Sequence, residues 1–313
     1  MWPWIIGLVG SFPTATSYEV GFCEGMRMPL LPLEVRPSDC DVYGHVNNAV
    51  YASYFEYALA HSLNTLGFEA DWQPNSTLYW TPHSLTLEYR QPAIWGDTLQ
   101  GHIWLSKPDA IRPSFGFEIL RPREGPQPLA PAVFRAEGTW GRNSRETDEP
   151  QEIPSVLLTA LANEEGAIPR LRPPTLLSSQ TRKYVFEHPV QGSEVGPSGH
   201  LQLQALYRLL EESLSDSCDQ AGWPKERWLA AGFFTVQTRH DSRIYSLPRA
   251  REFISITSQL IESRRLGGTW QIVVRRDTDG PVLVEDYSTG VHLNLEGHPA
   301  SPPAQILQAI QFG

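Results

Sequence analysis

Apolar residues recur at intervals of three and four in two stretches of the chain. The first stretch has them at Ala52, Phe55, Leu59, Leu63 and Leu66, and the second at Leu203, Leu206, Leu210 and Leu214. This spacing puts the apolar side chains on one face of an α-helix. Each stretch ends at a glycine, Gly67 or Gly222, the residue type that most readily takes the left-handed conformation that closes a helix. The pattern therefore predicts two helices, each with one buried face.

Runs of alternating or continuous apolar residues follow each helix and predict β-strands. After the first helix they cover residues 84–89, 98–105, 115–120 and 132–140, and after the second residues 252–260, 269–275 and 282–291. The segment Asp277-Thr278-Asp279-Gly280 between the last two runs predicts a hairpin turn. One helix followed by several antiparallel strands, twice over, indicates an α+β fold.

The two halves of the chain also resemble each other at a fixed offset. Gly44, His45, Glu56 and Gly67 correspond to Gly199, His200, Glu211 and Gly222, each 155 residues later, and Tyr89 and Pro92 match Tyr245 and Pro248 at 156. An ordered set of matches is what a tandem duplication of one domain would leave. We therefore expect an N-terminal extension at 1–27, a first domain at 28–145, a linker at 146–182 with a short helix near 156–163, and a second domain at 183–313.

Composition narrows the classes of protein that this chain can be. Of its 313 residues 41% are hydrophobic, which is enough for a folded core, and its net charge of −10 argues against a general nucleic-acid binder. Three cysteines, none at metal-ligand spacing, favour a reducing compartment, and we expect a cytoplasmic protein without metal or cofactor. Because no apolar run reaches about 18 residues, no membrane span is predicted.

The residues around the first repeat resemble a known family. The pattern Asp41-x-x-Gly44-His45-Val46-Asn47-Asn48-Ala49-x-Tyr51-x-x-Tyr54-x-Glu56 is similar to the signature of hot-dog-fold thioesterases of the 4-hydroxybenzoyl-CoA thioesterase type. Residues 194–212 resemble the N-terminal hot-dog of acyl-ACP thioesterases, and the His-Val-Asn-Asn stretch with residues 86–90 resembles their C-terminal one, in swapped order. The resemblance implies two tandem hot-dog domains, each a long central helix wrapped by a curved antiparallel sheet, with the active site at their junction.

The resemblance implies an acyl thioester hydrolase of fatty acid or lipid metabolism, which releases a free acid and a thiol from acyl-CoA or acyl-ACP. Asp41 takes the position of the family's catalytic aspartate and would act as general base or nucleophile. Its alternative role is to cap the helix. Gly44, His45 and Val46 lie where the helix is expected to begin, so that free N–H groups there would polarise the thioester carbonyl.

Neighbouring residues complete the predicted site, and each has a structural alternative. His45 would orient a water or the substrate, or it would hold the loop, as His200 suggests because Gly196 stands opposite Asp41 in the second half. Asn47 would act in catalysis and Asn48 in substrate binding, or both would bond the backbone at the helix entrance. Two further substrate contacts depart from the acyl-ACP thioesterase pattern: Tyr43 replaces an Asn, and Gln91 replaces a Glu.

Two helix carboxylates, Glu56 and Glu211, are candidates to reach across the junction, although exposed helix glutamates are common. Because the second half lacks an aspartate at the Asp41 position, we expect one working site per chain. An intrachain pair of domains permits a monomer and leaves a further homodimer open. Two other functions remain: a dehydratase or hydratase acting on 3-hydroxyacyl thioesters, and a non-catalytic protein that binds acyl thioesters.

Overall fold

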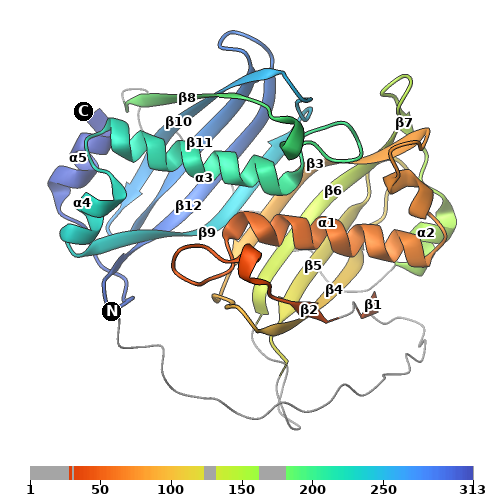
Figure 1. Ribbon diagram of the computed structural model, residues 1–313, viewed down its shortest axis with the longest axis horizontal. Helices are drawn as coiled ribbons and strands as arrows, with labels where there is room; N and C mark the ends of the chain where they lie inside the picture. Colours follow the sequence, from red (N-terminus) through yellow and green to blue (C-terminus); the bar gives the residue numbers. More distant parts are fainter. Residues whose placement is uncertain (1–27, 30–31, 123–131, 162–180, 313) are drawn as a thin grey trace.

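The computed structural model describes residues 28–29, 32–122, 132–161 and 181–312, so the expected N-terminal extension lies outside it. Two similar units lie side by side, each with one long helix packed on a sheet (Figure 1). The long helices are α1 (Asn48–Thr65) and α3 (Leu203–Gln220). Gly67 and Gly222 follow them with φ of 85° and 76°, which confirms the predicted helix ends.

The first unit holds the strands predicted from its sequence, several of them longer than expected. Its main strands are β3 (Leu78–Tyr89), β4 (Thr98–Lys107), β5 (Ser114–Leu120) and β6 (Ala132–Ser144). Three two-residue strands, β1 (Met28–Pro29), β2 (Leu33–Glu34) and β7 (Pro150–Gln151), and the helix α2 (Ser155–Ala160) complete it.

The second unit repeats this plan with additions at both ends. Its strands are β8 (Lys183–Pro189), β9 (Phe233–Ile244), β10 (Phe253–Arg264), β11 (Gly267–Arg276) and β12 (Val282–Asn294). Two shorter helices, α4 (Lys225–Ala230) and α5 (Ala304–Phe312), pack near its outer end (Figure 1). Neither β8 nor β9 was predicted from the sequence, because polar residues interrupt both strands.

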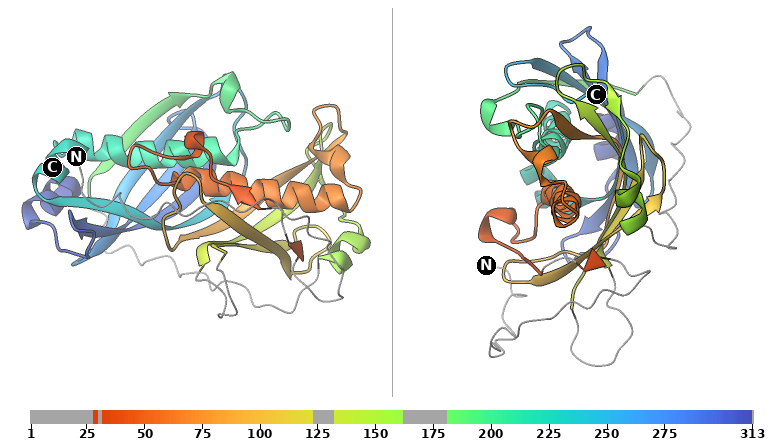
Figure 2. Two further views of the ribbon diagram at one scale, coloured as in Figure 1. Left: turned by 60° about the horizontal axis from the view of Figure 1, so that its bottom comes forward. Right: turned by 90° about the vertical axis from the view of Figure 1, so that its right-hand side faces the viewer.

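The two units share one antiparallel sheet, in the order β1-β4-β5-β6-β3-β9-β12-β11-β10-β8. The seam is the pairing of β3 with β9, in which Thr86 stands opposite Asp241, its own equivalent 155 residues later. An approximate twofold axis therefore passes between these two residues. The sheet curves around both long helices, which contact each other inside it (Figure 2). This is the predicted fold of two tandem hot-dog domains.

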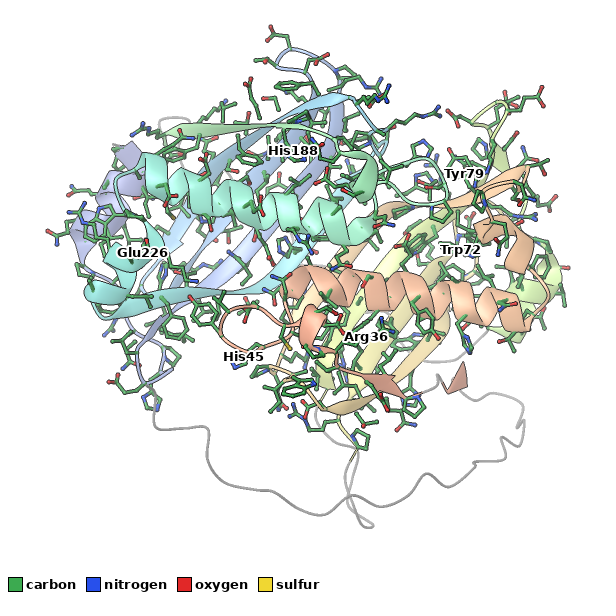
Figure 3. The ribbon with its side chains drawn as sticks, in the orientation of Figure 1. Arg36, His45, Trp72, Tyr79, His188 and Glu226 are labelled. Atoms are coloured by element: carbon green, nitrogen blue, oxygen red, sulfur yellow. The ribbon has the colours of Figure 1, made fainter. Side chains whose placement is uncertain are left out.

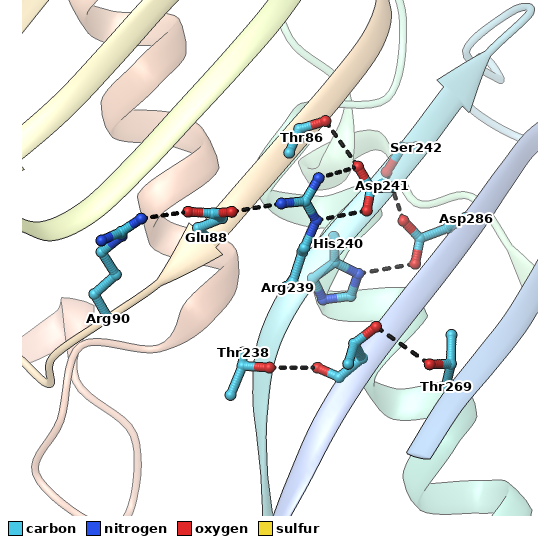
Figure 4. Close-up of polar contacts among 11 residues, drawn as sticks. Thr86, Glu88, Arg90, Thr238, Arg239, His240, Asp241, Ser242, Thr269 and Asp286 are labelled. Carbon is cyan, nitrogen blue, oxygen red and sulfur yellow. Dashed lines mark hydrogen bonds and ion pairs between the residues drawn. The ribbon is translucent and has the colours of Figure 1, made fainter. Parts of the chain in front are cut away.

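Charged side chains link the units across this seam. Arg239 on β9 pairs with Glu88 on β3 and, through its Nε, with Asp241 at 2.7 Å. The Thr86 hydroxyl donates to the Asp241 carboxylate at 2.8 Å (Figure 4). Since Arg239 is nearly buried, with a side chain 6% exposed, these hydrogen-bonded pairs also supply the partners that a buried charge requires.

Backbone hydrogen bonds around the two loops keep the offset of 155. The Asp41 N–H donates to the His45 carbonyl at 2.8 Å, and the Gly196 N–H donates to the His200 carbonyl at 2.9 Å. Further along, Val46 bonds Ala93 and Leu201 bonds Pro248, both at 2.8 Å. Ala93 is thus the equivalent of Pro248, so the predicted change to an offset of 156, with Pro92 matched to Pro248, was wrong.

The first unit extends beyond residue 145, where the sequence analysis ended it. The predicted short helix near 156–163 is α2, and the side chains of Ile153, Leu157 and Leu161 are buried in the main core. The Leu105 N–H donates to the Leu161 carbonyl at 2.7 Å. Residues 146–161 therefore pack as part of the first unit, and the rest of the expected linker, 162–180, lies outside the described residues.

The core lies between the long helices and the sheet and is continuous across both units. In the first unit Phe55 of α1 stacks on Phe117 of β5, with ring centroids 5.3 Å apart. A Cβ at Gly138 would lie 2.9 Å from the Phe55 ring, so a glycine is needed where β6 passes beneath the helix. None of the helices in the described ranges combines the length and apolar character needed to cross a bilayer.

Candidate active site

The loop before α1 is a tight turn organised by Asp41. Its Oδ1 accepts the N–H of Tyr43 at 2.8 Å and that of His45 at 3.3 Å. Gly44 has φ of 79°, a conformation that side-chain-bearing residues rarely take, and its N–H donates to the Asp41 carbonyl at 3.0 Å. Asp41 therefore shapes the loop through one carboxylate oxygen while remaining partly exposed.

The helix begins later than the sequence analysis predicted. Asn47 is the N-cap of α1, and its Oδ1 accepts the Ala49 N–H at 2.9 Å. The N–H groups of Gly44, His45 and Val46 are all donated within the protein, so they are not free to polarise a carbonyl. Val46 is buried in the core rather than placed at a substrate. The expected role of Gly44–Val46 in carbonyl binding was therefore wrong.

Three other predicted residues lie at the surface. Tyr43 is half exposed, and the ammonium of Lys225, from α4 of the second unit, lies 4.2 Å from its ring centroid. His45 is exposed in the loop ahead of α1 (Figure 3), and Gln91 is exposed just after β3. Tyr43 thus contacts the other unit, whereas His45 and Gln91 face solvent.

Glu211 of α3 crosses the junction and meets this loop. Asn47 Nδ2 donates to Glu211 Oε2 at 3.4 Å, and the Asn48 side chain also bonds this carboxylate. Burial raises the pKa of Glu211 against the lowering effects of His240 and these amides, and the charge of Asp41 adds to the rise. The structure therefore brings together two residues predicted for catalysis, Asp41 and Asn47, one predicted for substrate binding, Asn48, and one of the two candidate helix carboxylates, Glu211.

Behind Glu211 lies a histidine–aspartate pair that the sequence analysis missed. His240 of β9 and Asp286 of β12 are both fully buried, with Nδ1 and Oδ2 2.8 Å apart (Figure 4). The Ser242 hydroxyl donates to the other Asp286 oxygen at 2.7 Å. Burial opposes a charge on His240, but the charge and hydrogen bond of Asp286, together with the charges of Glu211 and Asp241, raise the pKa of the imidazole. A histidine and an aspartate are a recognisable pair of catalytic residue types. The sequence could have placed His240 beside Asp286 only if strand β9 had been predicted as a neighbour of β12.

Three polar atoms of this cluster are buried and have no hydrogen-bond partner in the described part of the chain. They are Glu211 Oε1, His240 Nε2 and the hydroxyl of Tyr89 on β3. The Tyr89 ring meets the His240 ring edge-on at 6.0 Å, and burial together with the charge of Glu211 raises the pKa of Tyr89. Because buried polar atoms are normally paired, these three indicate a place where a water or a substrate atom binds.

The twofold axis creates a second junction, where Glu56 of α1 faces the second unit's loop. A pocket of about 220 Å³ opens there, lined among others by Glu56, Trp72, Tyr79, Trp80, His200 and Gln202. Figure 3 shows Trp72 and Tyr79 on the same side of α1. Burial raises the pKa of Glu56 to about 7. The loop repeats the turn around Asp41, but Gly196 supplies no carboxylate, so Glu56 belongs to a different site from the one expected.

Comparison with known proteins agrees with this architecture. Residues 35–161 match the family model described as the thioesterase-like superfamily. A protein assigned as an oleoyl thioesterase from Lactobacillus plantarum is similar in structure, with a TM-score of 0.69 at 12% identity over 89% of this chain and 98% of that one. An acyl-ACP thioesterase from Bacteroides thetaiotaomicron gives 0.63 at 11% identity, over 83% and 96% of the two chains.

The 12:0-ACP thioesterase from Umbellularia californica is also similar, with a TM-score of 0.65 at 9% identity over 84% of this chain and 93% of that one. At these identities the structures show the shared fold of paired hot-dog units. The family match adds the class of enzyme, because its model covers the Asp41 loop, α1 and the first sheet. The chain is therefore a thioesterase of the hot-dog fold, and its first unit matches the model of the thioesterase-like superfamily.

Proposed function

We propose that the chain hydrolyses acyl thioesters carried by acyl carrier protein or coenzyme A, at the junction of the Asp41 loop with Glu211. One observation carries this proposal: a carboxylate from the second unit is hydrogen-bonded to Asn47 beside the family's aspartate position. The names of the structural neighbours support an acyl thioester as substrate. The arrangement also accounts for two fused units, since neither holds both carboxylates.

Two carboxyl groups in unlike surroundings can divide the work of hydrolysis. Asp41, which is partly exposed, accepts a proton from water as it attacks the thioester carbon, or attacks that carbon itself and forms an anhydride that water then hydrolyses. Glu211, whose pKa burial raises, is the acid partner and donates a hydrogen bond to the carbonyl oxygen as negative charge develops there. It takes over the task that the Gly44–Val46 amides cannot perform. The thiolate then leaves with little assistance and takes up the proton.

His240 and Asp286 hold Glu211 ready from behind. Their buried pair places a charged or proton-bearing imidazole next to Glu211, and the two groups influence each other's pKa. Asn47 and Asn48 fix the carboxyl from the loop side. Neither His240 nor Asp286 reaches the surface, so they act as positioning residues for Glu211, and a water rather than the substrate pairs with the buried Nε2 of His240.

Thiol release tests this function directly. Purified protein is assayed with a chromogenic thiol reagent on panels of acyl-CoA and acyl-ACP, beside Asp41→Asn and Glu211→Ala. Release that collapses in both variants, with circular dichroism unchanged, supports a site that needs both carboxyls. Release that survives both variants would place hydrolysis elsewhere, and no release from any thioester would contradict the proposal.

The His240–Asp286 pair favours a second candidate, a hydratase or dehydratase acting on 3-hydroxyacyl thioesters. Such chemistry uses a histidine and a carboxylate at one site, and Glu211 with His240 provides that combination. Full burial of His240 weighs against it, since the imidazole would have to reach the substrate. Absorbance of a 2-enoyl thioester, followed alongside thiol release, distinguishes the two reactions.

A further inference from the structure

The Glu56 pocket is the twofold counterpart of the proposed hydrolytic site, and its loop has the same backbone. Gly199 repeats the positive φ of Gly44, at 85°, and its N–H donates to the Gly196 carbonyl at 2.9 Å. Gln202 takes the place of Asn47 before α3. The two sites therefore differ in side chains rather than in backbone geometry.

A carboxyl without protein partners faces this pocket. Glu56 is partly accessible and makes no hydrogen bond or ion pair with any residue in the described ranges, unlike Glu211. Since its pKa is about 7, a large share of Glu56 is uncharged at neutral pH. A neutral carboxyl has one O–H donor and one carbonyl acceptor, which together complement an uncharged carbonyl group of a ligand.

The remaining walls also suit an uncharged ligand. No Lys or Arg occurs among the described residues that line the pocket, and burial lowers the pKa of His200, which keeps this imidazole neutral. Asp71, the other acid in the lining, is already paired with Arg142 at 2.6 Å. Trp72, Tyr79 and Trp80 supply flat apolar surfaces. The guanidinium of Arg145 lies beside the pocket, but it is already bonded to the carbonyls of Pro197 and Ser198 and packs against the Tyr79 ring. An acyl group with its carbonyl therefore fits the Glu56 donor and the apolar walls better than an anion does.

Hydrolysis is not expected here, because Gly196 replaces the aspartate that would accept the proton of water. We propose that the Glu56 pocket is a second acyl-thioester site that binds the ligand through its carbonyl without cleaving it, which rests on the proposed function of the chain. The chain would then hold one acyl group at the Asp41 junction for hydrolysis and another at the Glu56 junction without turnover.

Binding stoichiometry tests this inference with a ligand that cannot be cleaved. The probe is an acyl-pantetheine in which an N–H replaces the thioester sulfur, titrated calorimetrically with short and long straight acyl chains. We expect two equivalents per chain for the wild type and one for Glu56→Leu, which removes the donor. Glu56→Gln keeps a donor and serves as the matched control, so it should retain two equivalents. One equivalent in the wild type, or two in Glu56→Leu, would overturn the inference.

A pH series provides a second measurement that does not depend on the Leu variant folding. Binding of the second equivalent to wild type should weaken about tenfold between about pH 6.5 and 8.5, as Glu56 ionises, and stay level in Glu56→Gln. A level wild-type curve would contradict the inference. Competition by free fatty acid would identify the pocket as a product site, and competition by unacylated pantetheine would show that the arm rather than the acyl group binds, which would overturn it.

The outcome is separable from that of the proposed function. Thiol release with a single equivalent of analogue leaves the hydrolase intact and removes the second site. Two equivalents that depend on Glu56, without thiol release from any substrate, support a binding pocket in a protein that does not hydrolyse thioesters.

Discussion

The two junctions of this molecule have the same backbone and different chemistry. At one, the loop carries Asp41 and Asn47, and Glu211 is bonded from the opposite helix. At the other, Gly196 and Gln202 replace these loop residues, and Glu56 faces a pocket with no partner from the described chain. A twofold arrangement of repeats therefore provides two copies of a site, and side-chain replacement on one loop is enough to make their functions diverge.

The largest expected difference lies in the aspartate itself. Asp41→Ala should reduce kcat for thiol release by about 10²–10⁴-fold, the range that general base catalysis contributes. Asp39→Asn, nearby on the same loop, is a control for loop damage, because Asp39 bonds Arg36 and Tyr54 rather than the turn. Equal losses in both variants would mean that the loop, not the carboxylate of Asp41, is what matters.

The second largest effect is expected at the buried His240–Asp286 pair behind Glu211, which has no counterpart at Glu56. Asp286→Asn leaves His240 without its charged partner in full burial, which should cost about 3–5 kcal/mol of unfolding free energy, measured by urea denaturation. If the pair positions Glu211, the pH profile of kcat should also shift in this variant. A loss of stability with an unmoved pH profile would make the pair structural only.

Glu211→Ala should lower thiol release by about 10²-fold, since it removes a hydrogen-bond donor to the developing oxyanion. The neighbouring Glu212, which is exposed on the same helix, provides the matched Glu212→Ala control. Because the acid form of Glu211 is required, wild-type activity should fall as pH rises through its elevated pKa, and Glu211→Gln should flatten that limb. Activity that instead rises steadily with pH would assign Glu211 the role of base.

Glu56 should reveal its protonated state through stability. Its pKa is raised to about 7 in the folded chain, so the folded state holds this proton more tightly than the unfolded state does. The stability that protonated Glu56 provides is therefore fully present at low pH and is lost as pH rises towards and through 7. Glu56→Gln should therefore stabilise the protein by on the order of 2 kcal/mol at about pH 8 and by little at about pH 4, measured by urea denaturation. The same gain at both pH values would show that Glu56 is not protonated by its surroundings.

Restoring the missing carboxylate is the smallest change we expect to detect. A Cβ at Gly196 would lie 3.1 Å from Cγ of Gln202, a flexible side chain that can shift by a few tenths of an ångström. Gly196→Asp with Gln202→Asn should therefore fold, with a loss of about 1 kcal/mol or less, and add weak thiol release in an Asp41→Ala background. No added release would show that loop chemistry alone does not convert one junction into the other.

Much of this architecture could be predicted from the sequence. The spacing of Phe55, Leu59 and Leu63 reports a buried helix face, and the glycines that end both helices report a left-handed residue, because these are local requirements. The repeated Gly-His motif indicated two equivalent loops. The helix start was predicted too early because Asn47 caps α1 while Gly44 forms a turn, and glycine suits either position.

The sequence by itself determined the two units and the aspartate on one loop, because a helical period and a short motif depend only on residues that are close together in the chain. Only the tertiary structure decided which carboxylate meets which loop. Pairing of β3 with β9 about a twofold axis sends Glu211 to Asp41 and Glu56 to Gly196, although each helix adjoins the other loop in the sequence. It likewise joins His240 to Asp286, 46 residues apart. The register of the strands decides which of these residues become neighbours. Register depends on contacts between distant parts of the chain, which a local sequence pattern does not show.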